Sequence, residues 1–158
     1  MVLFLSKKVR IKKSKIGKGL FAIKRIGRGS LIIDYFQGKG KFLCLHDYDR
    51  LYNNGFDYDI QIDDDLFFAP ISKKDLQDAD YLNHSCNPNC GINGSFKIVA
   101  LKDIEPGEEI TFDYAMSEST DYKIKCNCGG LGCRGIILGS DYKRKDLQKN
   151  IMVFFLIT

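Results

Sequence analysis

The chain has 158 residues, enough for one domain with a hydrophobic core, and its 44% hydrophobic and 28% charged residues are typical of a globular protein. A net charge of +4 is only mildly basic, so direct nucleic-acid binding is not expected. No stretch reaches the ~18 apolar residues that span a bilayer, and MVLFLSKK at the start is too short for a secretory signal. We therefore expect a soluble intracellular protein without membrane attachment, in the nucleus or the cytoplasm.

Short apolar stretches separated by glycine and polar turn residues follow one another along the chain. They have strand length and are rich in Ile, Val, Phe and Tyr, which predicts strands within residues 17–26, 29–38, 56–62, 66–71, 95–104 and 108–115. Only residues 73–82 and 140–151 have a helical pattern. The sequence thus predicts a mainly β fold of several small sheets, without the strand–helix alternation of a doubly wound fold. The apolar tail IMVFFLIT is expected to pack as a last strand or against a partner.

The first motif in chain order is KIGKGLF, residues 15–21, which contains Gly17 and Gly19. Two glycines at this spacing are typical of a hairpin turn. They also allow a ligand to approach the backbone of Lys18, Gly19 and Leu20, because no side chain blocks it. The motif alone does not choose between these interpretations.

The loop NHSCNPNC, residues 83–90, is the second motif. Its proline between two asparagines ends any regular helix, and no apolar alternation supports a long strand. So many polar and sulfur donors in an irregular loop indicate either an exposed turn or a site.

The third motif, CNCGGLGC, places Cys126, Cys128 and Cys133 within eight residues. Three thiolates separated by glycines that permit positive φ can wrap around one tetrahedral zinc ion, although reduced buried cysteines are an alternative. No fourth ligand follows nearby, so a distant residue must supply it. The candidates are the remaining cysteines and the two histidines: Cys86, Cys90, His84, Cys44 and His46. If Cys86 supplies it, the loop 83–90 lies against the cysteine segment.

Taken together, four motifs resemble those of SET-domain protein-lysine N-methyltransferases with a post-SET zinc motif. They are KIGKGLFA, YLNHSCNPNC, EEITFDY and CNCGGLGCRG, and their order agrees over roughly residues 8–137. The resemblance implies a β-clip-like SET fold in which the NHSC and TFDY segments meet in a knot-like crossing. It also implies a SET domain at 8–117, a post-SET zinc segment at 118–137 and a C-terminal appendage at 138–158.

The same resemblance implies S-adenosylmethionine and zinc as cofactors. The backbone of Lys18, Gly19 and Leu20 and the side chains of Asn83 and His84 would contact S-adenosylmethionine, and Tyr114 would be the catalytic tyrosine. The implied zinc ligands are four cysteines: Cys86, Cys126, Cys128 and Cys133. Cys90 would then be a core residue on the next strand, although its position keeps it a rival to Cys86.

The implied lysine channel is lined by Tyr35, Phe36 and Phe112. Here the sequence departs from the family pattern: DYFQG stands where the family has EYxG, so either Phe36 replaces the tyrosine or Tyr35 does so with a one-residue bulge. Asp80 stands where the family usually has arginine, which changes a supporting contact. Phe112 is also compatible with a simple core position on its strand.

Two functions remain open on these observations. The first is methylation of a lysine in a protein substrate, histone-like or otherwise basic. The second is a catalytically silent, zinc-stapled module that binds protein or nucleic acid. The presence of Tyr114, Asn83, His84 and both glycines favours the enzyme. The sequence does not indicate an oligomeric state.

Overall fold

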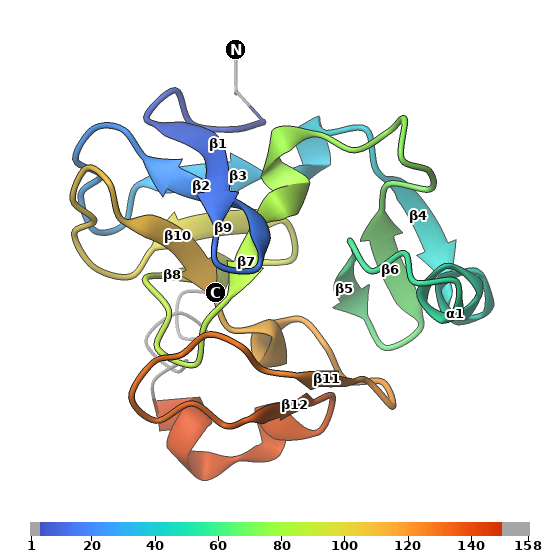
Figure 1. The fold of residues 1–158 in the computed structure, drawn as a ribbon. Coiled ribbons are helices and arrows are strands. Elements are labelled where there is room, and N and C mark those ends of the chain that lie inside the picture. The colour runs from blue at the N-terminus through green and yellow to red at the C-terminus, as the bar shows by residue number, and fades with distance from the viewer. Residues whose placement is uncertain (1–3, 150–158) are drawn as a thin grey trace.

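The computed structural model describes residues 4–149, in which short strands form four small sheets (Figure 1). Three of the sheets form the upper part of the molecule in Figure 1, and the fourth lies below them with the C-terminal segment. This arrangement confirms the predicted mainly β fold of several small sheets. No helix in the described part of the chain is long and apolar enough to cross a membrane.

The first sheet brings the glycine motif, the NHSC motif and the TFDY motif together. Its order is β1-β2-β10-β7, with β1 Val9–Ser14, β2 Gly17–Ala22, β7 Asn83–His84 and β10 Glu109–Phe112. β7 and β10 are parallel, with Asn83 opposite Thr111 and His84 opposite Phe112. The NHSC and TFDY segments, about 30 residues apart in sequence, therefore lie side by side. Gly17, at φ 119°, begins β2 directly after the two-residue turn at 15–16.

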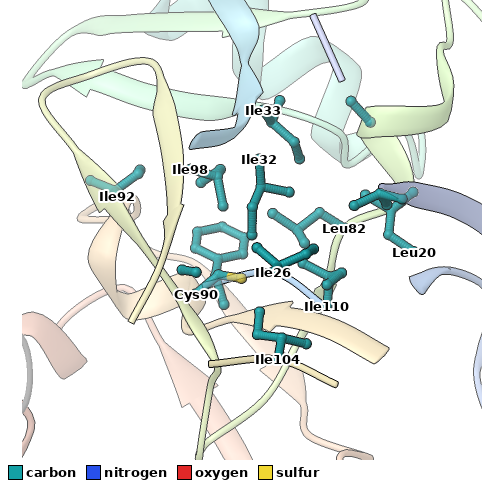
Figure 2. Packing of buried hydrophobic residues seen from close by; sticks show 14 of the residues in the cluster. Leu20, Ile26, Ile32, Ile33, Leu82, Cys90, Ile92, Ile98, Ile104 and Ile110 are labelled. Atoms are coloured by element: carbon teal, nitrogen blue, oxygen red, sulfur yellow. The ribbon is translucent and has the colours of Figure 1, made fainter. Parts of the chain in front are cut away.

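The second sheet, β3-β9-β8, packs with the first around the main core. It comprises β3 Leu31–Asp34, β8 Cys90–Asn93 and β9 Lys97–Ala100. Figure 2 shows the branched side chains of the two sheets pointing toward one another, among them Ile33, Ile98, Leu20 and Ile110, all fully buried. Each such side chain contributes about 1.5–3 kcal/mol through burial, which makes this core the rigid support of the site. Cys90 lies in this core, as expected.

The third sheet, β4-β6-β5, carries a helix that the sequence analysis missed. It comprises β4 Lys41–Cys44, β5 Ile60–Asp63 and β6 Leu66–Ala69, and α1 Leu45–Asn53 follows β4 directly. The helix is held by tertiary packing: Tyr48 is buried and its ring stacks on Phe67 with centroids 4.1 Å apart. Such packing can fix a helix whose sequence has only moderate helical propensity.

The helix predicted at residues 73–82 is wrong. Only a 3₁₀ turn, η2 Asp78–Tyr81, forms there. Side chains bond the local backbone instead: Gln77 and Asp80 form a reciprocal capping box, and Ser72 donates to Asp75. These local bonds compete with a continuous helix.

The last sheet pairs β11 Lys123–Lys125 with β12 Ile136–Leu138 on either side of the cysteine motif. The other short helices are 3₁₀ turns: η1 Tyr35–Gln37, η3 Tyr114–Met116 and η4 Asp141–Lys143. Residues 145–149 are helical, in partial agreement with the helix predicted at 140–151. The apolar tail lies outside the described residues.

Candidate active site and metal centre

Asn83, at the start of the NHSC motif, is fixed by two neighbours. Its Nδ2 donates to the Lys18 carbonyl oxygen at 2.9 Å and to Glu109 Oε1 at 2.7 Å. Both amide protons are thus used, and the Oδ1 atom makes no hydrogen bond within residues 4–149. Gly19 is required beside it, because a Cβ there would collide with Asn83 Nδ2 at 2.8 Å and with the Glu109 carboxylate.

A pocket of about 80 Å³ opens beside Asn83 and His84, between the β1–β2 turn, β10 and residues 127–128. It combines the free carboxamide oxygen of Asn83, the imidazole of His84 and residues 14–16 at the turn. This set fits the amine and adenosine parts of S-adenosylmethionine, which offer donors and a flat ring. Lys18, Gly19 and Leu20 do not line this pocket, and Leu20 is fully buried in the core, so their contact with a cofactor stays a prediction.

His84 links this pocket to Tyr114 and to the cysteines. Its Nδ1 accepts the Tyr114 backbone amide at 3.2 Å, and its Nε2 lies 3.3 Å from Cys86 Sγ. Burial, partly opposed by Asp113, lowers the pKa of His84 to about 4, so the ring is neutral at physiological pH. Because Nδ1 is an acceptor, the ring proton lies on Nε2 and points at the Cys86 sulfur.

The thiols of the cysteine motif gather around Cys86. Cys126 Sγ lies 3.6 Å from Cys86 Sγ and 3.5 Å from Cys133 Sγ. The Cys86, Cys126 and Cys128 sulfurs and a His84 ring nitrogen all lie within 4.8 Å of one another; the predicted ligand Cys133 is not in this group, although its Sγ contacts that of Cys126. The other candidates lie elsewhere: Cys90 is in the core, and Cys44 is exposed beside Asp47.

This geometry fits a zinc ion. Tetrahedral zinc with ~2.3 Å Zn–S bonds separates its sulfurs by about 3.8 Å, close to the spacing of these thiols. The chain wraps the cluster with glycines at positive φ, Gly129 at 66°, Gly132 at 78° and Gly135 at 73°. Burial acts to raise the pKa of Cys128, but hydrogen bonds from the Cys86 and Gly130 amides prevail and lower it to about 6, which favours a thiolate ligand.

A buried arginine, which sequence reasoning missed, connects the cysteine segment to the tyrosine motif. Arg134 donates from Nη1 and Nη2 to the two carboxylate oxygens of Asp113, each at 2.6 Å. Its Nε, which has no hydrogen-bond partner in the described chain, lies 3.0 Å from Asp141 Oδ2. Arg134 also donates its backbone amide to Cys86 Sγ at 3.3 Å. The sequence feature that could have indicated this role is its position directly after Cys133.

Tyr114 lies at a second cavity, on the other side of the β7–β10 pair, with a volume of about 50 Å³. Its hydroxyl donates to the Leu82 carbonyl oxygen at 3.1 Å, and its ring centroid is 5.1 Å from that of Phe112. Burial raises the pKa of Tyr114, so its hydroxyl is protonated at physiological pH. Phe112 belongs to the core and lines the cavity at the same time.

Of the two alternatives in DYFQG, the structure brings Tyr35 to the cavity. Tyr35 lines it and donates its hydroxyl to the Ala79 carbonyl oxygen at 3.2 Å. Phe36 lies outside the cavity: it is 60% exposed and packs against Phe96. Asp80 also lines the cavity, where burial raises its pKa to about 6.

Sequence reasoning missed the remaining polar wall of this cavity. It comes from the segment before β5 and from the stretch after η3, namely Asp57, Tyr58, Asp59, Glu118 and Tyr122. The only local sign of this wall was the pattern Asp57-Tyr58-Asp59 inside a predicted strand. Polar residues at alternate positions of a strand lie on one face, which indicates that this face is not packed in the hydrophobic core.

Comparisons with known proteins agree with this geometry. The family model described as SET domain matches residues 17–115. Among similar proteins, one from Schizosaccharomyces pombe named histone-lysine N-methyltransferase, H3 lysine-4 specific, is 36% identical over 75% of this chain and 14% of its own length. An Aspergillus oryzae protein of the same name is 34% identical over 83% of this chain and 12% of its own. Histone-lysine N-methyltransferase set-2 of Caenorhabditis elegans is 33% identical over 85% of this chain and 9% of its own.

The chain therefore spans only about a seventh or less of the length of these relatives. The family model nevertheless covers more than half of the chain, and it includes both glycines of the first motif and the NHSC and TFDY motifs. The chain belongs to the SET-domain family.

Proposed function

We propose that this protein is an S-adenosylmethionine-dependent protein-lysine N-methyltransferase that acts on a histone or another basic protein. One observation carries the proposal: a single strand pair, β7–β10, separates the Asn83–His84 pocket from the cavity that holds the Tyr114 hydroxyl. A cofactor site and an amine channel that meet at one wall suit transfer of a small group between two bound molecules. The names of the relatives support a histone substrate.

In this proposal the cofactor is held by the backbone of residues 18–20 and by Asn83 and His84. Asn83 Oδ1 accepts a hydrogen bond from the cofactor's ammonium group, since Glu109 and Lys18 already occupy both protons of Nδ2. When bound, S-adenosylmethionine supplies an electrophilic methyl group on a sulfonium. Glu109 orients Asn83 and does not contact the reacting atoms.

The substrate lysine enters the cavity between Tyr35, Phe112 and Tyr114. Its unperturbed pKa is ~10.4, and the aromatic walls favour the neutral amine because they remove the ammonium from water. The Tyr114 hydroxyl, already directed at the Leu82 carbonyl, orients the amine. The buried Phe112 leaves room around the amine for a second methyl group, because its side chain has no hydroxyl that could hold a water there.

Zinc is proposed to have a structural role, with Cys86, Cys126, Cys128 and Cys133 as ligands. His84 is close enough to compete, but its Nδ1 accepts the Tyr114 amide and its Nε2 proton points at Cys86. It therefore supports a ligand sulfur, as is usual around metal sites. Residues 8–117 would form the SET domain, 118–137 the zinc segment and 138–158 the appendage.

The test is methyl transfer from radiolabelled S-adenosylmethionine to purified core histones and, in parallel, to a set of non-histone basic proteins. Tyr114→Phe should lose most of the transfer while it keeps zinc and cofactor binding. Tyr142→Phe is the matched control, since Tyr142 is 40% exposed on η4 and lines neither the cofactor pocket nor the cavity. A wild-type protein that binds cofactor and methylates none of these proteins would support the silent module instead.

A further inference from the structure

In the part of the chain that the structure describes, acidic side chains without a positively charged partner line the lysine cavity. Four carboxylates line it: Asp57, Asp59, Asp80 and Glu118. The other titratable groups that face them are tyrosines: Tyr35, Tyr58, Tyr114 and Tyr122 line the cavity, and Tyr48 contacts Glu118 from α1. Within the described residues, no Lys, Arg or His lines the cavity and none of the four carboxylates belongs to an ion pair.

Carboxylates without a positively charged partner destabilise the folded protein when they line a buried cavity. Burying a charge without a partner is unfavourable, and proteins normally pair it. Elsewhere this chain follows that rule, as the buried Asp113 and Asp141 both contact Arg134. A small cavity with aromatic walls and unpaired carboxylates therefore indicates a cationic ligand of small cross-section, such as an alkylammonium group.

The four carboxylates differ in the hydrogen bonds that they already accept. Glu118 accepts from the Tyr48 hydroxyl at 3.3 Å and from the Thr120 amide at 2.9 Å. Asp80 accepts the Gln77 amide at 2.7 Å, and Asp57 accepts the Tyr122 hydroxyl at 3.1 Å.

Asp59 has the fewest hydrogen-bond partners of the four carboxylates. It accepts no hydrogen bond from a third described residue, but it lies close enough to Asp57 for their carboxyl groups to share one. Burial, together with the neighbouring charges of Asp57 and Glu118, raises the pKa of Asp59 well above its usual value. Of the four carboxylates, it is the one best able to take up a proton.

We propose that the Asp57–Asp59 carboxylate pair binds the ammonium group of the substrate lysine and that Asp59 accepts its proton. The inference rests on the proposed function and adds to it a residue that generates the nucleophile. In the step, one N–H bond of the ammonium breaks and its electron pair stays on nitrogen. Asp59 is ionised when the step begins, because the ammonium bound beside it favours the charged carboxylate. An O–H bond then forms on Asp59, and the lysine is left as the neutral amine that can attack the methyl group.

The direction of this transfer follows from burial. In water the ammonium would keep its proton, because its pKa of ~10.4 lies far above that of a carboxyl group. In a cavity of low polarity both charged forms are disfavoured, which raises the carboxyl pKa and lowers the ammonium pKa. The proton can later leave through a larger groove of about 560 Å³, which shares Ser117 and Glu118 with the cavity.

The ammonium site can be tested without any protein substrate. The probe is n-butylammonium chloride, which copies the end of a lysine side chain, and the readout is the ¹³C NMR signal of the aspartate carboxyl carbons. The Asp59 signal should shift saturably with n-butylammonium and stay unchanged with n-butanol, and the shift should disappear in Asp57→Asn. Equal responses to the two probes, or no response, would overturn the site.

The proton transfer is tested by the pH dependence of methylation of a histone H3 peptide that contains lysine 4. Asp59→Asn should lower kcat/KM on the order of 10²-fold at pH 7.5. The deficit should shrink severalfold by pH 9.5, where solvent can remove the proton. Asp65→Asn, an exposed aspartate between β5 and β6, is the control and should stay within about twofold of wild type at every pH. A deficit of equal size at both pH values would mean a merely structural role and refute proton acceptance.

The two proposals fail in different ways. Wild-type protein that methylates no histone but binds n-butylammonium at Asp59 would refute the proposed function and leave the ammonium site standing. Wild-type protein that methylates the peptide, with Asp59→Asn equally active, would refute the present inference and leave the proposed function standing.

Discussion

Replacing Arg134 by alanine tests whether the cysteine segment is fastened to the tyrosine motif by a buried ion pair. Both Nη atoms of Arg134 bond the carboxylate of Asp113 at 2.6 Å, and the side chains of the pair are only 5% and 4% exposed. Alanine would leave Asp113 and Asp141 buried without a cation. Breaking one side of a buried pair typically costs about 3–5 kcal/mol, since the remaining charge stays desolvated.

That loss is large against the free energy of unfolding of an ordinary domain, about 5–15 kcal/mol. For a chain of this size it corresponds to a fall in melting temperature of about 6–20 °C. The assay is chemical denaturation followed by circular dichroism, with the zinc content of each sample measured, because the Arg134 amide also bonds Cys86.

Arg144→Ala is the matched control, since the Arg144–Asp146 pair is 45% and 64% exposed and water screens it, so its loss should change stability little. If Arg134→Ala with its zinc still bound loses no more than this control, the pair does not fasten the segment and the reasoning is refuted.

Other consequences can be measured on the same protein. Cys133→Ser should lose most of its zinc in elemental analysis while Cys44→Ser keeps about one ion per chain, because only the first removes a thiol from the cluster. Asn83→Ala should weaken S-adenosylmethionine binding by about 1–3 kcal/mol in calorimetry, and unchanged affinity would remove Asn83 from the pocket. Wild type should add at least two methyl groups to one lysine and Phe112→Tyr should shift the product toward one, as mass spectra over time will reveal. Asp80→Asn should raise the free energy of unfolding at pH 8 by about 1–2 kcal/mol and leave it unchanged below pH 4. The folded pKa of Asp80, about 6, lies above its unfolded value. The stability that protonated Asp80 contributes at low pH is therefore lost as the pH rises, and asparagine does not lose it.

The sequence predicted those parts of the molecule in which a local pattern has a local cause. Apolar runs between glycines became strands, and the glycines of the cysteine motif adopt the positive φ that wrapping requires. The side-by-side placement of NHSC and TFDY came from the family resemblance, because nothing in either segment alone fixes a parallel pair. Cys90 was expected in the core, where β8 buries it.

The errors concern residues whose structure depends on distant partners. Helix α1 forms where Tyr48 can stack on Phe67, a contact that no local pattern announces. The carboxylates of the lysine cavity come from separate segments, and their significance lies in the absence of any described cation among them. Asp57 and Asp59 looked like ordinary polar residues of a strand until the fold brought Glu118 and Tyr122 to the same wall.

The cavity wall and the metal cluster are built in part from the same segment of the chain. Glu118 and Tyr122 lie between η3 and Cys126, so their segment is held at one end by the Asp113–Arg134 pair and at the other by the thiols. Thiols gathered this closely repel one another as thiolates, and a metal ion removes that repulsion when it binds. In the proposed function, binding of the metal is then coupled to closing the wall that would face the substrate lysine. The zinc segment would thus be needed for the shape of the lysine cavity, although none of its cysteines lines it.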